Sequence, residues 1–316
     1  MKLDQVGTLA LGCAPFGNLY EPVAEADVQG CVDAAWDLGV RLFDTAPLYG
    51  HGLSEQRLGA ALRGRPRDDY VLSTKVGRVL VPIDDPASEP PTIFADVPPM
   101  RPAFDYSADG VLRSVEASLE RLGLDRIDVL HVHDPDDHLD QAIAEAYPVL
   151  LDLRDQGMIG AVGIGTNHAW LAERVLAAVD LDCVLLAGRI TLLDQSGTAS
   201  LLPACAERGV AVLAAGVFNS GILVDPRPGA PFHYEDAPAA VVARAQRLAA
   251  VCARHEVPLA AAALQLPRRH TAVTTVLVGA STAAELDEDA RLLQRPIPEA
   301  LWRDLAAEGI DVGPLA

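Results

Sequence analysis

Side chains that can move protons stand at the ends of three strand-like segments of the sequence. Asp44 ends the first of them, with Tyr49 five residues beyond it, while Lys75 ends the second and His133 the third. A phenol is a poor base near neutral pH, but an adjacent ammonium group favours the phenolate and lowers its pKa from about 10. A carboxylate fixes the ammonium group in place, and an imidazole donates a hydrogen bond to the same substrate oxygen. The set therefore predicts proton transfer to or from a carbonyl or hydroxyl oxygen.

Each of these residues also has a purely structural interpretation. Asp44 can cap a turn, Tyr49 can be a surface aromatic residue, and Lys75 can form an ion pair that has no catalytic role. His131 and His133 lie on the same side of a strand and could together bind a metal. A metal site needs further ligands at other strand ends, and three later strand-like segments end in residues that supply none, Ala187-Gly188-Arg189, Ala214-Ala215-Gly216 and Val278-Gly279-Ala280. We therefore predict no metal site.

Strand-like and helix-like segments alternate along the chain. Eight short apolar runs are typical of parallel strands buried on both faces, and they lie at residues 8–13, 40–44, 70–75, 127–132, 160–164, 182–187, 209–214 and 274–278. Segments with helical periodicity lie between them, at residues 24–38, 107–122, 140–156, 168–179, 198–208 and 237–255. Eight such repeats favour a (β/α)8 TIM barrel, an α/β fold, over a doubly wound sheet, and no Gly-rich GxGxxG turn follows an early strand.

Active sites of such barrels lie at the carboxyl ends of the strands, from which two long loops are expected to depart. Residues 78–106 follow the third strand and residues 218–238 the seventh, and loops of this length in a compact domain are commonly functional. The segment before the first repeat predicts a short N-terminal hairpin under the barrel. No linker divides the sequence, so we expect residues 1–316 to form a single domain.

The composition narrows the possible partners and the compartment. The chain has 316 residues, half of them apolar, and a formal net charge of −19. This charge argues against nucleic acid and membrane partners, since both need a basic surface, and no apolar run reaches the roughly 20 residues that span a bilayer. The N-terminus lacks the apolar stretch of a signal peptide, and the five scattered cysteines predict buried thiols, so we expect a cytoplasmic protein. Only two lysines occur, Lys2 and Lys75, as expected if position 75 requires a compact ammonium group.

The residues around these strand ends resemble those of the aldo-keto reductase family. The resemblance extends over nearly the whole chain, and it rests on Phe43-Asp44-Thr45-Ala46 with Tyr49-Gly50 and Ser54-Glu55, on Ser73-Thr74-Lys75, on Asp128-Val129-Leu130-His131-Val132-His133, on Gly163-Ile164-Gly165-Thr166-Asn167 and on Gly279-Ala280-Ser281. It implies that Tyr49 is the general acid/base, that Lys75 and Asp44 tune it, and that His133 orients the reacting oxygen. His131 lies one pleat deeper and then belongs to the barrel interior.

The resemblance also implies a nicotinamide cofactor that lies extended across the barrel mouth. The implied contacts are Thr166 and Asn167 at the carboxamide, Phe218, Asn219, Ser220 and Gly221 over the pyrophosphate, and Gly279, Ser281, Glu285 and Asp289 towards the adenosine end.

Two departures from the family pattern bear on the cofactor. Glu285 takes the place of the arginine that grips the 2′-phosphate in NADP-preferring members. A carboxylate there repels that phosphate and accepts from a ribose hydroxyl, or it complements a helix N-terminus; both interpretations predict NAD and make NADP less favourable. Many members also carry a glutamine and a stacking aromatic residue near the positions of Leu186 and Ala215. Phe218 is the candidate that could stack on the nicotinamide instead.

Three short sequence segments resemble the aldose 1-dehydrogenase and pyridoxal 4-dehydrogenase branch of the family, and they lie at residues 186–195, 217–221 and 133–136. This resemblance implies oxidation of an aldose of the L-fucose, L-galactose or D-arabinose type at C1 to the lactone with NAD. The alternatives are a pyridoxal 4-dehydrogenase, an NADPH-dependent aldehyde or ketone reductase and, from a different class, a redox-sensing regulatory subunit. Arg189 faces the cofactor or a sugar hydroxyl, or it forms an ion pair beneath a loop. The partner is a small sugar or aldehyde, and the chain is expected to be a monomer or a homodimer.

Overall fold

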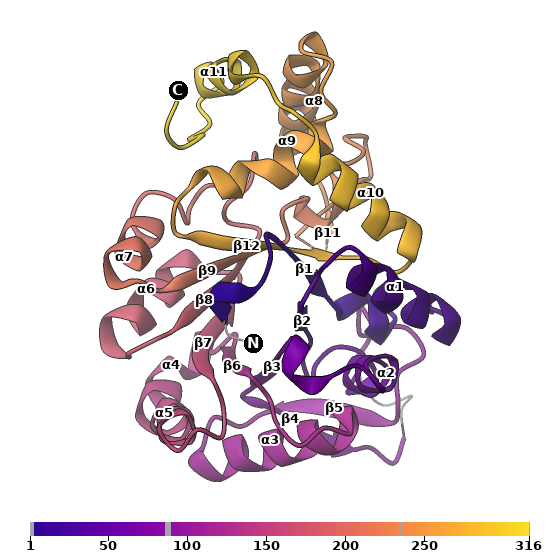
Figure 1. Cartoon of the computed structure of the whole chain (residues 1–316), viewed down its shortest axis with the longest axis vertical. Helices are drawn as coiled ribbons and strands as arrows, with labels where there is room; N and C mark the ends of the chain where they lie inside the picture. The colour runs from indigo at the N-terminus through magenta and orange to yellow at the C-terminus, as the bar shows by residue number, and fades with distance from the viewer. Residues whose placement is uncertain (1–2, 86–89, 234, 316) are drawn as a thin grey trace.

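A closed barrel of eight parallel strands forms the centre of the molecule (Figure 1). The computed structural model describes residues 3–85, 90–233 and 235–315. Around the barrel the strands follow their order in the sequence, and they are β1 Leu9–Gly12, β2 Leu42–Asp44, β3 Val71–Val76, β6 Val129–His133, β7 Ala161–Thr166, β8 Cys183–Ala187, β9 Ala211–Ala215 and β12 Val273–Gly279. All eight predicted strands are confirmed, and so is the (β/α)8 barrel.

Both faces of these strands are buried because each face packs in its own apolar cluster. The cluster inside the barrel includes Ala10, Leu42, Val71, Val129 and Leu213. Alternate residues of the same strands pack outward beneath the helices, as Leu11, Phe43, Leu72, Leu130 and Val212 do. This double burial explains why the strands read as nearly continuous apolar runs.

Helices with the predicted periodicity cover the outside of the barrel (Figure 1). They are α1 Glu25–Asp37, α3 Ala108–Leu122, α5 Tyr147–Asp155, α6 Ala169–Ala178, α7 Leu201–Arg208 and α8 Ala239–Arg254, with the short α4 Leu139–Gln141 and a π-helical turn Ala142–Ala146 before α5. The Ser107 side chain accepts a hydrogen bond from Gly110 N and caps α3. Gly123, with φ +64°, ends that helix, as a glycine after an amphipathic helix predicts.

Four further helices were not identified from periodicity, namely α2 Leu53–Ala61, α9 Leu259–Gln265, α10 Ala283–Gln294 and α11 Glu299–Ala307. Residues of α8, α9 and α11 share a second apolar cluster beside the barrel, which includes Leu248, Ala263 and Trp302. No helix among the described residues is long and apolar enough to cross a membrane. All five cysteines are buried and unpaired, as predicted.

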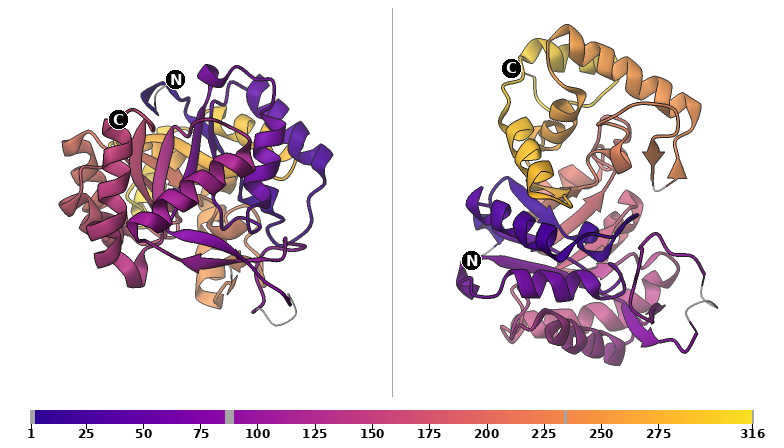
Figure 2. Two further views of the ribbon diagram at one scale, coloured as in Figure 1. Left: turned by 90° about the horizontal axis from the view of Figure 1, so that it is seen from below. Right: turned by 90° about the vertical axis from the view of Figure 1, so that its right-hand side faces the viewer.

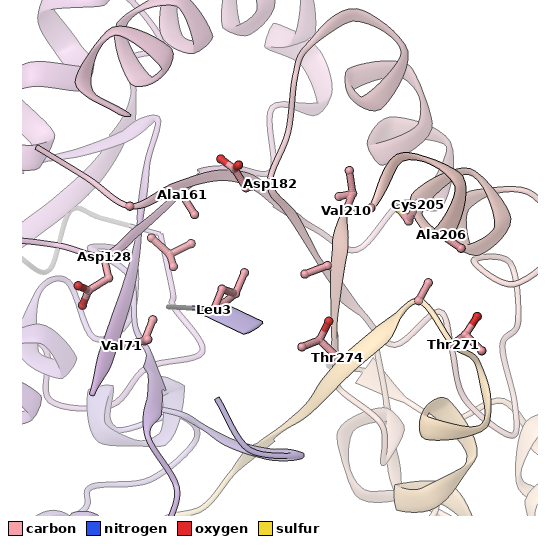
Figure 3. A pocket seen from close by; sticks show the side chains of 15 residues that line it. Leu3, Val71, Asp128, Ala161, Asp182, Cys205, Ala206, Val210, Thr271 and Thr274 are labelled. Atoms are coloured by element: carbon pink, nitrogen blue, oxygen red, sulfur yellow. The ribbon is translucent and has the colours of Figure 1, made fainter. Parts of the chain in front are cut away.

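The N-terminal segment does not form the expected hairpin. Leu3–Gln5 form a single 3-10 turn, and β1 bonds to β2 on one side and to β12 on the other. The run at residues 8–13 is a barrel strand, as predicted, and the described residues before it contain no strand, while residues 1 and 2 lie outside the described part of the chain. Leu3 instead lies in a cavity of about 780 Å³ that is lined by residues at the starts of the strands, among them Val71, Ala161 and Val210 (Figure 3).

The two long loops contain hairpins at the other end of the barrel. β4 Arg78–Pro82 pairs with β5 Met100–Phe104, and β10 Pro231–Phe232 pairs with β11 Glu235–Asp236. Both views of Figure 2 place these hairpins away from the N-terminus. The loops therefore leave the carboxyl ends of the strands, as predicted; residues 86–89 and 234 within them lie outside the described part of the chain.

Candidate active site

A buried ion pair joins the carboxyl end of β2 to β3. Lys75 Nζ donates to Asp44 Oδ2 at 2.7 Å, and the two side chains are 1% and 2% exposed. Ser73 Oγ donates to Asp44 Oδ1 at 2.7 Å, and Lys75 Nζ also donates to the carbonyl oxygen of Thr45 at 2.8 Å. Alternation along both strands directs the charges into the barrel. Buried charges persist only where hydrogen bonds and a counter-charge satisfy them, as happens here.

Tyr49 lies beside this ion pair on the loop after β2. Its ring centre is 4.6 Å from Lys75 Nζ and 6.0 Å from the ring centre of His133. The loop is held by a close approach of two backbones, since a Cβ at Gly17 would lie 2.5 Å from Gly50 N. The structure thus brings together Tyr49, Lys75, His133 and Asp44, as the sequence predicts.

Glycines on β7 make room for the side chains of its neighbours. A Cβ at Gly163 would lie 2.5 Å from His131 Nδ1, and one at Gly165 would lie 3.3 Å from Lys75 Cε. His131 is fully buried, as an interior position predicts, and His133 is 6% exposed at the mouth. Among the described residues no group of three or more His, Cys, Asp or Glu side chains could hold a metal ion.

The pKa of Tyr49 is raised above its ordinary value, which differs from the lowering by Lys75 that the sequence predicts. Burial has the largest influence and raises this pKa; Lys75 lowers it, and Asp44 raises it again. The expected influence of Lys75 is therefore present but outweighed by desolvation of the phenolate. Tyr49 is a protonated phenol at neutral pH and can donate a hydrogen bond to a substrate oxygen.

The neighbouring groups have defined charges. Burial by itself lowers the pKa of Lys75, but Asp44 and Tyr49 raise it by more than burial lowers it. The net shift is therefore upward, and Lys75 stays in the ammonium form. Burial, followed by the cations Lys75 and Arg78, lowers the pKa of His133 well below its ordinary value. His133 is therefore a neutral imidazole at pH 7, which can donate one hydrogen bond while it remains uncharged.

Thr166 ends β7 at the barrel mouth, and Asn167 follows it. Thr166 Oγ1 accepts from His168 N at 3.1 Å and so stabilises the turn that leads into α6. The Asn167 side chain is partly exposed and makes no hydrogen bond to any residue that the structure describes. Its amide is the group of this pair with hydrogen-bonding capacity for a ligand.

The loop after β9 carries the next predicted cofactor residues. Phe218 packs partly against both the outer barrel cluster and the cluster of the C-terminal helices. Asn219 Nδ2 donates to Gly188 O at 3.3 Å, whereas its buried Oδ1 has no partner within the described parts of the chain. Asn219, Ser220 and Gly221 have φ values of +48°, +64° and +113°, which produce a sharp turn at the barrel mouth.

The end of β12 and the start of α10 carry the remaining predicted residues. Gly279 is exposed at the strand end. Glu285 Oε2 accepts from Ser281 N at 2.7 Å, while Thr282 Oγ1 accepts from Glu285 N at 3.3 Å. Glu285 therefore takes part in a reciprocal cap of α10, which is the helix-terminal interpretation of this residue. Its side chain remains exposed, so its charge also acts on any ligand at this end.

Asp289 is a carboxyl group buried on α10. Burial, followed by Glu285 and Glu288, raises its pKa to about 7. In the unfolded chain this pKa is about 3.9, so the folded state is increasingly disfavoured as the pH rises from about 4 to about 7. Asp289→Asn removes this penalty and is expected to raise the free energy of unfolding at pH 8 by about 1–3 kcal/mol. Urea unfolding without cofactor at pH 8 and at pH 4.5 measures it.

The gain from Asp289→Asn should nearly vanish at the lower pH. Asp287→Asn, at an exposed position two residues earlier on the same helix, is the matched control and should change stability little at either pH. Equal stabilisation by Asp289→Asn at both pH values would contradict the assigned pKa.

Arg189 forms the ion pair that was one of its two expected roles. Its Nη1 is 3.3 Å from Asp194 Oδ2 and 2.9 Å from His233 Nε2, and the side chain is 14% exposed. These contacts tie the β10–β11 hairpin to the end of β8. Leu186 is buried in the outer cluster and Ala215 in the inner one, so neither supplies an aromatic or amide group at the mouth.

Three residues that position the site were not singled out from the sequence. Ser73 orients Asp44, Gly17 admits the Tyr49 loop, and Tyr106 Oη donates to His133 O at 2.6 Å. Ser73 has a usable signal, because it stands two residues before Lys75 and shares its inward face. The contact between Tyr106 and β6 joins residues 27 positions apart, and no local pattern predicts it.

Nearly the whole chain matches a known protein family. The Aldo/keto reductase family model matches residues 8–307. The chain belongs to the aldo-keto reductase family. Curated aldo-keto reductase relatives include D-threo-aldose 1-dehydrogenase of a Pseudomonas species, 42% identical over 95% of this chain and 93% of the relative, and pyridoxal 4-dehydrogenase of Microbacterium luteolum, 41% identical over 96% and 94%. The family and these relatives make this aldo-keto reductase an NAD(P)-dependent oxidoreductase.

A solved structure shares the aldo-keto reductase fold at low sequence identity. Glycerol dehydrogenase of Gluconobacter oxydans superimposes with a TM-score of 0.75 and is 21% identical, over 98% of this chain and 94% of that chain.

The barrel mouth also fits a nicotinamide cofactor. Gly216 and Gly279 are exposed there, so bare backbone lines part of it, and the Asn219 oxygen and the Asn167 amide have no protein partner among the described residues.

Proposed function

We propose that this aldo-keto reductase oxidises an aldose of the L-fucose, L-galactose or D-arabinose type at C1 to the lactone, with NAD. The observation that carries the catalytic part is the arrangement of Tyr49, beside a buried Asp44–Lys75 pair and opposite a neutral His133. The substrate class rests on the resemblance to aldose 1-dehydrogenase.

In this proposal Tyr49 is the proton-transfer residue. The substrate hydroxyl lies between the Tyr49 phenol and His133, which donates a hydrogen bond and fixes the oxygen. During oxidation the Tyr49 phenolate takes up the hydroxyl proton, and during reduction the phenol returns it, while the charge of Lys75 stabilises the phenolate. A bound nicotinamide would supply the acceptor for the hydride that leaves C1, and the electron pair of the broken O–H bond would complete the lactone carbonyl.

The residues that would hold the cofactor are Asn167, the turn 218–221, Gly279, Ser281, Glu285 and Asp289. Thr166 would support Asn167. NAD is proposed over NADP because Glu285 places an exposed acidic side chain where a 2′-phosphate would need a cation. Phe218 remains the proposed stacking residue, because Ala215 at the end of β9 is too small.

Pyridoxal is the second candidate substrate. The 41% identity to a pyridoxal 4-dehydrogenase is nearly as high as that to the aldose enzyme. The four proposed catalytic residues do not separate the two, because an alcohol or lactol oxygen presents the same proton to Tyr49.

The test is a panel of initial rates of nicotinamide reduction. L-fucose, L-galactose, D-arabinose, L-glucose and pyridoxal are each assayed with NAD and with NADP, for the wild type and for Glu285→Gln. We expect sugar turnover with a strong preference for NAD, and a weaker preference in Glu285→Gln. Glu288→Gln, at an exposed position three residues after Glu285 on the same helix, controls for general charge loss. Turnover of pyridoxal but of no sugar would make pyridoxal the substrate instead of an aldose. Turnover of aldehydes with NADPH but of no sugar would overturn both the proposed substrate and the proposed cofactor.

A further inference from the structure

A second pair of opposite charges lies beside the proposed catalytic residues. Asp134 follows His133 directly, and its Oδ2 is 3.5 Å from His133 Nε2 and 3.1 Å from Arg78 Nη2. The Asp134 and Arg78 side chains are 21% and 18% exposed, so the pair is partly buried and remains accessible to a small ligand. The Asp134 carboxylate also acts electrostatically on Tyr49 and Lys75. It therefore stands next to the position of the reacting oxygen.

The backbone of Asp134 is held in a fixed and unusual conformation. Its φ is +41°, a left-handed value that non-glycine residues adopt rarely. Tyr106 Oη donates to the carbonyl oxygens of His133 and Asp134, and Asp134 N donates to Gly165 O at 3.0 Å. Conformations of this kind persist where the surroundings enforce them, and they concentrate at functional sites.

The pair keeps hydrogen-bonding capacity after its own contact. Both side-chain contacts of Asp134 go to Oδ2, which leaves Oδ1 as an acceptor within the described structure. Arg78 Nε is buried without a partner among the described residues. A hydroxyl group both donates and accepts, so it complements a carboxylate and a guanidinium together.

We propose that Asp134 and Arg78 recognise a hydroxyl group on the carbon next to the reacting carbon. The pair makes the enzyme selective for 2-hydroxy carbonyl compounds and for the aldoses that contain this unit. The inference rests on the proposed function, because it takes the reacting oxygen to lie between Tyr49 and His133. A substrate without that hydroxyl leaves charged groups of the pocket without their partner, and sites of this kind reject the deoxy analogue.

The test compares substrates that differ in one hydroxyl. In reduction the pair is lactaldehyde and propanal, and in oxidation it is D-arabinose and 2-deoxy-D-ribose. The wild type is expected to favour the hydroxylated member, and Asp134→Asn should reduce this ratio of kcat/KM by roughly tenfold or more. Asparagine has the same size and tolerates a positive φ. Arg78→Gln should lower the same ratio. Asp136→Asn, which removes a carboxylate paired with His168 at 3.2 Å, is the control that should keep it.

Each outcome bears on one claim. A wild type without preference, or an unchanged ratio in Asp134→Asn, overturns the role of Asp134. An equal loss on both members of a pair, with a shifted pH profile, would instead make Asp134 a positioning residue for His133 and also overturns it. Silence on every aldose together with a lactaldehyde preference that Asp134→Asn removes refutes only the aldose assignment. Melting temperature and NADH fluorescence titration verify that each variant folds and binds cofactor.

Discussion

The Tyr49→Phe variant is expected to lose about 10²–10⁴-fold in kcat in both directions while it keeps its affinity for the nicotinamide cofactor. The substitution removes only the hydroxyl that transfers the proton and leaves the ring beside Lys75 and His133. His133 does not replace it, because its depressed pKa makes the imidazole a poor proton acceptor at neutral pH.

Stopped-flow or steady-state rates on the best substrate of the panel measure this loss, and NADH fluorescence measures cofactor affinity. Tyr147→Phe is the matched control. Tyr147 is fully buried, lies outside the site, and its hydroxyl has no partner in the described structure. Turnover of Tyr49→Phe within tenfold of the wild type would refute the assignment of the proton-transfer residue.

The rates of oxidation and reduction should depend on pH in opposite directions if Tyr49 transfers the proton. The pKa of Tyr49 lies above its ordinary value, so the phenolate fraction grows as the pH rises through the alkaline range. Oxidation should therefore accelerate with rising pH, and reduction, which needs the protonated phenol, should slow. Tyr49→Phe should abolish this alkaline dependence. A profile that is unchanged in the variant would assign the ionisation to another group.

Lys75→Met is expected to lower the free energy of unfolding by about 3–5 kcal/mol and to abolish turnover. The variant leaves the Asp44 carboxylate inside the barrel with only the Ser73 hydroxyl as a partner among the described contacts. It also removes the cation that opposes the rise in the Tyr49 pKa. Urea unfolding at pH 7 measures the stability, and the substrate panel measures turnover.

A double-mutant cycle separates the lost ion pair from a general packing defect. Asp44→Asn combined with Lys75→Met removes both charges and should regain most of the stability that Lys75→Met alone loses. Glu25→Gln supplies the exposed counterpart, because Glu25 pairs with Arg57 while 71% exposed, and it should cost less than about 1 kcal/mol. A double variant no more stable than Lys75→Met would contradict the burial argument.

Much of the fold was predictable because it follows from local patterns. Strands buried on both faces must be apolar throughout, so the runs that became β1, β3 and β9 were visible without any tertiary information. The position of Asp44 and Lys75 at the ends of two such runs likewise placed them at the barrel mouth. Four outer helices were missed, because α2, α9 and α11 span only seven to nine residues and α10 carries several acidic residues.

The N-terminal segment shows where local patterns fail. The run that became β1 was predicted as a barrel strand, whereas the residues before it were expected to form a hairpin and include the 3-10 turn Leu3–Gln5 instead. The conformation of this short segment depends on contacts with distant parts of the chain, and its own sequence holds no record of them.

By itself, the sequence determined which chemical groups stand at the strand ends, because residue type and pleat alternation fix both. Only the tertiary structure decided how those groups behave. The direction of the Tyr49 pKa depends on the balance between desolvation and the charges of Lys75 and Asp44. The partners of Arg189 and the contact between Asp134 and Arg78 depend on loops that return from distant parts of the chain. Desolvation and short-range electrostatics depend on distances in space, and the folded barrel alone sets those distances.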